Sequence, residues 1–479
     1  MKIFRSPLFI VWVVMAGWAF DAGAQTETNL HSFVGPPSDG DLPSASLIQG
    51  SDGNFYGTTY EGGTQNSGTV FRISPGGSYT SLYSFVGSPT DGANPWELVQ
   101  ASDGNFYGTT FAGGTVNSGT VFRISPGGSY SNLYSFGSHT NDGLVVHFGL
   151  VQGGDGNLYG TTEKGGTAGL GTVYRISTSG TYTSLYSFVG PPADGANPLC
   201  VLVQGSDSNF YGTTVFGGTS TNCGVGVGCG TVFRFSPSGG ETNLFSFAVS
   251  LTGGATPFSG LARGSDGNFY GTTYTGGTNI TCATGCGTVY RISPSGSYSN
   301  LHSFVGFPTD GVQLFAAPVL GSDGNFYGTT FTGGTVNSGT VFRISPSGSY
   351  SNLYSFGSVP NDGENPFAGL VQGSDGNFYG TAERGGTNNF GTIFKLTFPL
   401  NSLANQISAI NKAGTNIIVS IPSIAGETYQ LQFSSSMKPT NWVNVSGASV
   451  TNCIGALLTL TNFGGASQPQ RYYRFDITP

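Results

Sequence analysis

Short runs of alternating apolar and polar residues recur along the chain, and they predict β-strands. The recurring runs are LVQGS, NFYGTT, GTVFRIS and SNLYSF. An Asp-Gly pair joins the first two runs, and a Pro-Gly-Gly or Pro-Ser-Gly turn joins the last two. Both connections favour tight hairpins because Gly tolerates a positive φ. Each unit is therefore predicted to contain four antiparallel strands.

The unit occurs seven times. The DGNFYGTT string recurs at intervals of 51 to 59 residues, with its tyrosine at Tyr56, Tyr107, Tyr159, Tyr211, Tyr270, Tyr327 and Tyr379. Four strands per roughly 50 residues are typical of a propeller blade, whereas solenoid repeats are usually shorter. We predict an all-β fold with a seven-bladed β-propeller at residues 25–398.

The two ends of the repeat complement each other. A first SNLYSF-like run, Thr28 to Phe33, precedes any unit, and the seventh unit stops at Phe398 without one. We expect the N-terminal run to complete the seventh blade as its outer strand and so to close the ring. Beyond the repeat, alternating segments at 416–421, 428–433 and 471–477 predict a small β-sandwich at residues 399–479.

The N-terminus has the pattern of an export signal. Lys2 and Arg5 precede an apolar run from Leu8 to Trp18, and Ala22-Gly23-Ala24 follows. We predict a signal peptide at residues 1–24; a membrane anchor is the alternative, but the run is short for a span. The mature chain should be a monomer without a membrane span. We expect it to be secreted or extracellular, at the cell surface or in the periplasm, in an oxidising compartment.

Composition agrees with short strands and tight turns. The chain has 80 Gly residues and 13% aromatic residues, but only 8% charged residues. The formal net charge of -8 comes with no Lys/Arg cluster beyond the first residues. We therefore expect no nucleic-acid partner.

The repeats resemble those of the bacterial choice-of-anchor GloVer tandem-repeat proteins, whose members end in different surface-sorting tails. The resemblance rests on the copies of DGNFYGTT, GGT and GTVFRIS between residues 28 and 398. It implies a secreted, propeller-like repeat protein and supplies no catalytic residues. This chain ends in RYYRFDITP, which does not match a sorting tail. Its C-terminal segment, with TYQLQFSSS, is similar to a β-sandwich appended to many secreted bacterial proteins.

Most of the 24 acidic residues have a structural explanation. One group lies in the predicted hairpin turns: Asp52, Asp103, Asp155, Asp207, Asp266, Asp323 and Asp375. A second group lies in the Asp-Gly pairs between units: Asp39, Asp91, Asp142, Asp194, Asp310 and Asp362. Calcium at the hairpin turns is the alternative, but calcium loops need several oxygen ligands at fixed spacing and each turn has one Asp.

Four cysteines lie in the GGT loops of two adjacent units. Local disulfides between Cys223 and Cys229 and between Cys282 and Cys286 are the simplest interpretation in an exported protein. A shared four-cysteine metal site is the alternative. The sequence does not pair Cys200 or Cys453.

Histidines give one further candidate metal site. His139, Asp142 and His147 lie in one inter-unit loop, but their spacing matches no zinc signature. We therefore expect no metal and no cofactor. His31 and His302 replace the tyrosine of the SNLYSF run, and we expect them to be edge or surface residues.

Sequence variation is concentrated on one predicted face. The Asp-Gly and Pro-Gly turns should lie on one face of the propeller, and the GGT and inter-unit loops on the other. Aromatic rings around a concave mouth can bind sugars or peptide side chains, but they can also fill the channel as core. The candidate ligand-binding residues on the variable face are Trp96, His147, Phe258, Phe315, Phe367, Glu163, Lys164, Glu383 and Arg384.

We predict a non-catalytic binding or scaffold protein that engages an extracellular glycan, a peptide or a surface protein through the loop face. A propeller enzyme acting on polysaccharide, a lyase or a glycosidase, is the alternative, with Glu163 and Glu383 as candidate carboxylates. A purely structural surface repeat is a third interpretation.

Overall fold

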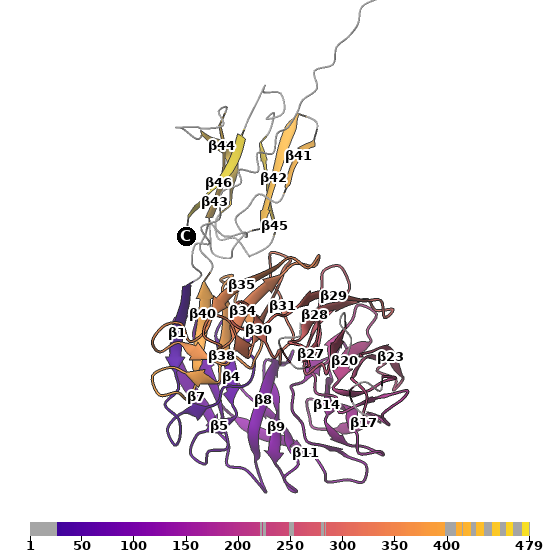
Figure 1. Ribbon diagram of the computed structural model, residues 1–479. Coiled ribbons are helices and arrows are strands. Elements are labelled where there is room, and N and C mark those ends of the chain that lie inside the picture. The colour runs from indigo at the N-terminus through magenta and orange to yellow at the C-terminus, as the bar shows by residue number, and fades with distance from the viewer. Residues whose placement is uncertain are drawn as a thin grey trace, which may run out of the picture.

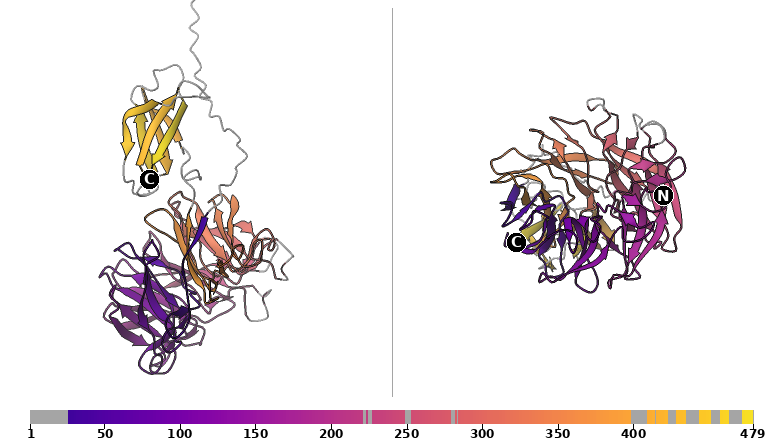
Figure 2. Two further views of the ribbon diagram at one scale, coloured as in Figure 1. Left: turned by 90° about the vertical axis from the view of Figure 1, so that its left-hand side faces the viewer. Right: turned by 90° about the horizontal axis from the view of Figure 1, so that it is seen from below.

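The computed structural model describes residues 26–220, 223, 227–248, 253–278, 282, 284–397, 409–413, 415–422, 428–434, 443–450, 457–462 and 472–478. Every regular element of these residues is a β-strand. Seven four-stranded antiparallel sheets surround one axis as a β-propeller (Figures 1 and 2). The predicted all-β class and the number of blades are confirmed. The predicted signal peptide lies outside the described residues.

The first six blades contain their strands in chain order, and the seventh adds the N-terminal strand. The first two blades contain β3 (Ile48–Gln49), β4 (Phe55–Thr59), β6 (Thr69–Ile73) and β7 (Tyr79–Ser84), then β8 (Gly92–Gln100), β9 (Phe106–Gly113), β10 (Thr120–Ile124) and β11 (Tyr130–Ser135). The next two contain β13 (Val151–Gln152), β14 (Leu158–Thr162), β16 (Thr172–Ile176) and β17 (Tyr182–Ser187), then β19 (Val203–Gln204), β20 (Phe210–Thr214), β22 (Thr231–Phe235) and β23 (Glu241–Ser246). The fifth and sixth contain β25 (Ala262–Arg263), β26 (Phe269–Thr273), β28 (Thr288–Ile292) and β29 (Tyr298–Ser303), then β31 (Val319–Leu320), β32 (Phe326–Thr330), β34 (Thr340–Ile344) and β35 (Tyr350–Ser355). The seventh contains β37 (Val371–Gln372), β38 (Phe378–Ala382), β40 (Thr392–Thr397) and, beside β40, β1 (Thr26–Ser32).

Short strand pairs join the inter-blade loops to the GGT loops. They are β2 (Gly40–Asp41) with β5 (Glu61–Gly62), β12 (Gly143–Leu144) with β15 (Lys164–Gly165), β18 (Gly195–Ala196) with β21 (Phe216–Gly217), β24 (Gly254–Ala255) with β27 (Thr275–Gly276), β30 (Gly311–Val312) with β33 (Thr332–Gly333), and β36 (Gly363–Glu364) with β39 (Arg384–Gly385). In the second blade the same segments belong to β8 and β9.

The second strand of each blade forms the core because neighbouring blades pack on both of its faces. In the first blade, the ring of Tyr56 lies 4.1 Å from that of Phe106 in the next blade. Gly57 follows Tyr56, and a Cβ there would lie 2.6 Å from the Phe71 ring. The glycine of the FYGTT run therefore makes room for an aromatic ring of the third strand.

The hairpin aspartates hold their own turns together. Asp52 accepts hydrogen bonds from the side-chain amide of Asn54 and from the hydroxyl of Tyr56, both at 2.8 Å. Burial opposes ionisation of Asp52, but these hydrogen bonds outweigh it and lower the pKa of the carboxyl. The corresponding residues of the other blades make the same bonds, so these carboxylates have the predicted structural role.

The inter-blade aspartates join neighbouring blades. Asp39 accepts a hydrogen bond from the Tyr79 hydroxyl at 2.7 Å and contacts His31 Nε2 at 3.0 Å. The His31 ring stacks on Tyr79 with 3.8 Å between centroids. His302 repeats this arrangement, and the two histidine side chains are only 21% and 20% exposed. Both histidines lie in the outer, edge strand of a blade, as one of the two predicted roles requires, but their rings are packed between blades and not at the surface.

In each blade, a threonine of the second strand donates a hydrogen bond to the next blade. Thr58 Oγ1 donates to the carbonyl of Trp96 at 2.9 Å, and Thr381 Oγ1 donates to the carbonyl of Ala45 at 3.2 Å. The other donors are Thr109, Thr161, Thr213, Thr272 and Thr329. At the outer edge of the seventh blade, β1 pairs antiparallel with β40 from Thr26↔Thr397 to Ser32↔Thr392 (Figure 1).

The C-terminal strands form two three-stranded sheets. One contains β41 (Ala409–Ala413), β42 (Asn416–Pro422) and β45 (Leu457–Asn462), and the other contains β44 (Val443–Val450), β43 (Thr428–Ser434) and β46 (Tyr472–Thr478). Val419, Leu431 and Val445, from both sheets, belong to one buried cluster.

Candidate functional site

The antiparallel strand order places the variable loops on one face of the ring. The Asp-Gly and Pro-Gly turns connect strands at one end of each blade, so the GGT and inter-blade loops lie at the other end. On the Asp-Gly face, glutamines of the first strands bond to the neighbouring blade, as Gln100 Oε1 does when it accepts from the Ser51 amide at 2.9 Å. That face is built from repeated structural contacts, which leaves the loop face as the candidate site.

Aromatic rings from five blades meet on the loop face. The Phe315 and Phe367 rings stack with 4.4 Å between centroids, and Phe367 lies 6.0 Å from Trp96. Trp96 also stacks on Phe148 at 5.7 Å. We define the aromatic crescent as Trp96, His147, Phe148, Phe258, Phe315 and Phe367.

A second row of rings supports the crescent. The Tyr60 ring lies 5.5 Å from Trp96, and the Phe111 ring lies 4.8 Å from His147. Tyr274 and Phe331 make similar contacts in the fifth and sixth blades. The first and fourth blades place Ser44 and Leu199 at the corresponding position, so the ring of aromatic residues is open there.

Members of the crescent differ in burial. Trp96 is 7% exposed, and its indole N–H has no hydrogen-bond partner among the described residues. His147, Phe258, Phe315 and Phe367 are half-buried. The tryptophan therefore belongs to the core, while the other rings both pack together and face solvent.

The candidate charged residues lie beside the crescent. His147 Nε2 lies 2.7 Å from Glu163 Oε2, and Lys164 Nζ lies 3.7 Å from the other oxygen of Glu163. The hydrogen bond with His147 is the main reason that the pKa of Glu163 is lowered. Burial has the opposite effect on Glu383, whose pKa is raised despite the nearby positive charge of Arg384. The described contacts do not join Glu163 to Glu383.

A cavity of about 450 Å³ lies on the channel axis and reaches the crescent at Phe148, Phe315 and Phe367. All seven blades contribute to its wall, with Ser46, Glu97, Leu150, Val201, Leu261, Val319 and Leu370 among the lining residues. An apolar cavity with a few polar groups is the usual form of a ligand pocket.

Glu97 is the carboxylate in this cavity, and it is not among the candidate residues predicted from the sequence. Its Oε2 accepts a hydrogen bond from the Gly149 amide of the next blade at 3.0 Å. Burial raises the pKa of Glu97 to about 7. The sequence did contain a signal, because two residues separate Pro95 from Leu98, whereas three separate Pro366 from Leu370.

Two disulfides join cysteines within the enlarged GGT loops. Cys223 is bonded to Cys229, and Cys282 is bonded to Cys286. The predicted pairing is confirmed, and the alternative four-cysteine metal site is wrong because these thiols are oxidised. Cys200 is buried and outside any disulfide of the described residues, and burial raises its pKa to about 11. Cys453 lies outside the described residues.

The candidate zinc residues have separate partners. His147 contacts Glu163, Asp142 accepts a hydrogen bond from the Tyr134 hydroxyl at 2.8 Å, and His139 is exposed. Among the described residues no cluster of three potential metal-ligating side chains of the Asp, Glu, His or Cys type occurs. The described part of the chain also contains no helix that could span a membrane.

Several solved structures are similar to this chain at low sequence identity. The extracellular domain of the proposed hybrid two-component system BT3049 from B. thetaiotaomicron is 12% identical with a TM-score of 0.50, over 91% of this chain and 55% of that one. The extracellular domain of the proposed one-component system BT4673 is 11% identical with a TM-score of 0.48, over 88% and 48%. The BP39L lectin from Burkholderia pseudomallei is 11% identical with a TM-score of 0.42, over 72% and 97%. This chain thus spans about half the length of the first two proteins.

Comparison of the sequence with family models identifies the family of this chain, which the structural similarities do not. The chain has no match among the curated proteins. A family model described as the Gloeobacter/Verrucomicrobia repeat matches residues 16–146, 138–312 and 221–427, which together span the whole propeller. The chain therefore belongs to the Gloeobacter/Verrucomicrobia repeat family.

Proposed function

We propose that this protein is a non-catalytic binding protein, secreted or held at the cell surface, that engages its ligand through the aromatic crescent. The observation that carries the proposal is the stacked pair Phe315 and Phe367, half-buried above a channel cavity of about 450 Å³. Exposed ring faces beside a concave apolar cavity favour recognition over packing alone. The two disulfides support an oxidising extracellular location.

An extracellular glycan is the first ligand class to test. Half-buried rings offer flat apolar faces to sugar rings, while Glu97 and Ser46 in the cavity could bind hydroxyl groups. A peptide or a surface protein would use the same rings. Lys164 and Arg384, both exposed beside the mouth, would then contact acidic groups of the ligand.

A glycan and peptide array with the purified mature protein, run with and without calcium, tests the proposal. Binding should fall at least about fivefold in Phe315→Ala and Phe367→Ala, because a central aromatic contact commonly contributes over about 1 kcal/mol. Ser295→Ala, in an exposed Pro-Ser-Gly turn on the opposite face, is the matched control and should bind normally. A ligand that crosslinks to the Asp-Gly face would refute the proposal.

The alternative function, an enzyme acting on polysaccharide, is favoured by one observation. Glu97 lies in the channel with a pKa of about 7, which suits a proton donor at neutral pH. Release of reducing ends or unsaturated products from a polysaccharide panel, lost in Glu97→Gln, would support an enzyme. Binding that is retained in Glu97→Gln without any product would support the non-catalytic role.

We further propose the domain arrangement that goes with this function. The pairing of β1 with β40 supports a ring closed by the N-terminal strand. The shared cluster of Val419, Leu431 and Val445 supports a C-terminal β-sandwich. Export by cleavage after residue 24 would start the mature protein at Gln25, directly before β1. N-terminal sequencing of the exported protein tests the cleavage site.

A further inference from the structure

Glu97 brings a carboxyl group to a level of the channel wall where most other blades have a small residue. The threonine bonds between blades define this level, because Glu97 directly follows Trp96, whose carbonyl accepts from Thr58. The residues that follow the corresponding carbonyls in the other blades are Ser46, Gly149, Val201, Gly260, Ala317 and Gly369. Apart from Gly149, all of these positions line the cavity of about 450 Å³.

Glu97 has no positively charged partner among the described residues. Its Oε2 accepts a hydrogen bond from the Gly149 amide at 3.0 Å, and this donor is neutral. Arg263 is the one cation in the described lining; it ends β25 at the Asp-Gly end of the wall and forms no ion pair with Glu97. Burial raises the pKa of Glu97 to about 7, since it outweighs the main-chain hydrogen bonds. A buried carboxyl of this kind favours a ligand that supplies positive charge.

The cations beside the mouth already face carboxylates. Lys164 Nζ lies 3.7 Å from Glu163 Oε1, and the positive charge of Arg384 acts on the neighbouring Glu383. Neither Lys164 nor Arg384 belongs to the described lining of the cavity. The charge that the cavity presents to a ligand at the level of Glu97 is therefore negative.

Aromatic rings from three blades line the cavity on the loop side of Glu97. Phe148 precedes Gly149, whose amide is bonded to Glu97. Phe315 and Phe367 line the cavity from the sixth and seventh blades and stack on each other. The face of an aromatic ring carries partial negative charge and attracts cations. A carboxylate beside several aromatic faces is an arrangement that binds an organic ammonium group.

We propose that the channel binds an amino sugar of an extracellular glycan, with its ammonium group between Glu97 and the rings of Phe148, Phe315 and Phe367. The assignment rests on the proposed binding function and names its ligand class. The cavity lies within the usual range of small-ligand pockets, about 300 to 1,000 Å³. Because N-acetylation removes the positive charge, the site should distinguish a free amino sugar from its acetylated form.

Ser46 favours a sugar over the lysine side chain of a peptide. Its hydroxyl accepts a hydrogen bond from the Gly369 amide at 3.0 Å, so its own hydrogen can be donated to a ligand. Ser46 and Glu97 occupy the same level of the wall in neighbouring blades. An amino sugar carries a hydroxyl on a carbon next to its amino group, whereas the lysine stem beside its ammonium group consists of methylene groups.

The test compares three tetrasaccharides that differ at one ring carbon. They are the β1→4 tetramers of glucosamine, N-acetylglucosamine and glucose, which carry an ammonium group, an uncharged acetamide and a hydroxyl at carbon 2. In calorimetric titrations of the native protein at pH 7, the glucosamine tetramer should bind at least about tenfold more tightly than either neutral tetramer, because only its charge can pair with Glu97.

Glu97→Gln removes the charge and keeps the size of the side chain and an acceptor for the Gly149 amide. The affinity of this variant for the glucosamine tetramer should fall to that for the neutral tetramers, which should bind as they do to the native protein. The comparison of the three tetramers on the native protein needs no variant, so it decides the question even if Glu97→Gln fails to fold.

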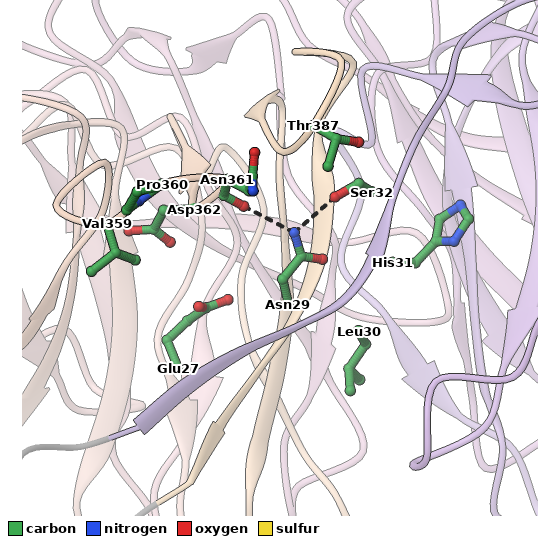
Figure 3. A pocket seen from close by; sticks show the side chains of 10 residues that line it. All are labelled: Glu27, Asn29, Leu30, His31, Ser32, Val359, Pro360, Asn361, Asp362 and Thr387. Carbon is green, nitrogen blue, oxygen red and sulfur yellow. Dashed lines mark hydrogen bonds between the residues drawn. The ribbon is translucent and has the colours of Figure 1, made fainter.

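Glu27→Gln is the matched control. Glu27 lines a second cavity, of about 430 Å³, between β1 and the loop before the seventh blade (Figure 3). The described lining of that cavity contains another carboxyl group, that of Asp362, but no phenylalanine, tyrosine or tryptophan. Burial raises the pKa of Glu27 as well, so the two substitutions remove similar carboxyl groups from cavities of similar size. Glu27→Gln should keep the preference for the glucosamine tetramer.

Several results would overturn the assignment. They are equal affinity of the native protein for the three tetramers, no binding of any of them, or an undiminished preference in Glu97→Gln. A lysine peptide that binds more tightly than the glucosamine tetramer and depends on Glu97 would also overturn it, because the ammonium group would then come from a peptide. If a neutral tetramer binds as tightly and loses affinity in Phe367→Ala, the amino-sugar assignment fails while the proposed binding function stands.

Discussion

Thr381 in the seventh blade donates its hydroxyl to the carbonyl of Ala45 in the first blade, at 3.2 Å. The same bond occurs at all six remaining junctions between neighbouring blades. The inner side of the ring is therefore continuous. At the outer edge, the ends of the repeat meet in the pairing of β1 with β40.

Removal of residues 25–34 should destabilise the propeller. The deletion takes away β1 and exposes the edge of β40, which can then pair with other molecules. We expect the free energy of unfolding to fall by several kcal/mol, or the protein to aggregate. Thermal unfolding with light scattering measures both, with the chain from Gln25 as the control. An unchanged midpoint would contradict ring closure by this strand.

Thr381→Val should cost about 1 to 2 kcal/mol, because the buried Ala45 carbonyl loses its donor while the side-chain shape is kept. Thr213→Val, at a junction inside the repeat, should cost the same amount. Denaturant titration of the two variants gives the comparison. A much smaller cost at Thr381 would show that the ring is weaker where its ends meet.

Trp96 and Phe367 should respond differently to truncation. Trp96 is 7% exposed, so Trp96→Ala should lower the free energy of unfolding by about 3 to 5 kcal/mol. Phe367→Ala should cost clearly less, because this ring is half-buried. Chemical denaturation measures both losses. Equal losses would mean that the crescent is core throughout and would weaken its role as a binding surface.

Glu97 should make stability fall as pH rises. Its pKa is 4.5 in the unfolded reference and about 7 in the fold, so the folded state binds the proton more tightly between these values. The destabilisation grows from pH 4.5 to 7 and is constant above. Glu97→Gln should therefore be less sensitive to pH over this interval, as measured by thermal midpoints. Glu27 and Glu241 have raised pKa values too, so part of the dependence should remain.

Loss of one loop disulfide should have a small global effect. Cys282 and Cys286 are four positions apart, and closure of so short a loop contributes about 2 kcal/mol or less. The double variant Cys282→Ser/Cys286→Ser should fold, with a midpoint close to that of the parent. Peptide mapping of the exported protein without reduction tests the pairing itself. Free thiols at these positions would contradict it.

The sequence patterns within one repeat unit predicted the strands of each blade. They did not predict the contacts between side chains of neighbouring blades. The Asp-Gly turn and the four apolar runs lie within one unit, so their structure follows from adjacent residues. The bond from Tyr79 to Asp39 depends on how one blade sits against the next, and no single unit specifies it. For this reason the stacking of His31 on Tyr79 of the neighbouring blade was not predicted.

The candidate site was predicted in outline. Its aromatic positions could be found because they break an otherwise regular repeat, and the structure brings Trp96, His147 and Phe367 together. The cavity below them could not be found in this way. Glu97 enters the channel because one residue is missing after Pro95, and that signal is visible only when the units are aligned residue by residue.

The threonine bonds between blades end on main-chain carbonyls, as at Trp96 and Ala45. A carbonyl is present whatever side chain its residue carries. The positions around the mouth can therefore change in size, charge and ring content without loss of the bonds that hold the blades together. Substitutions at Ser44, Leu199 or Phe258 should therefore change which ligand binds at the mouth of the channel. The hydrogen bonds between the blades should be retained in these variants.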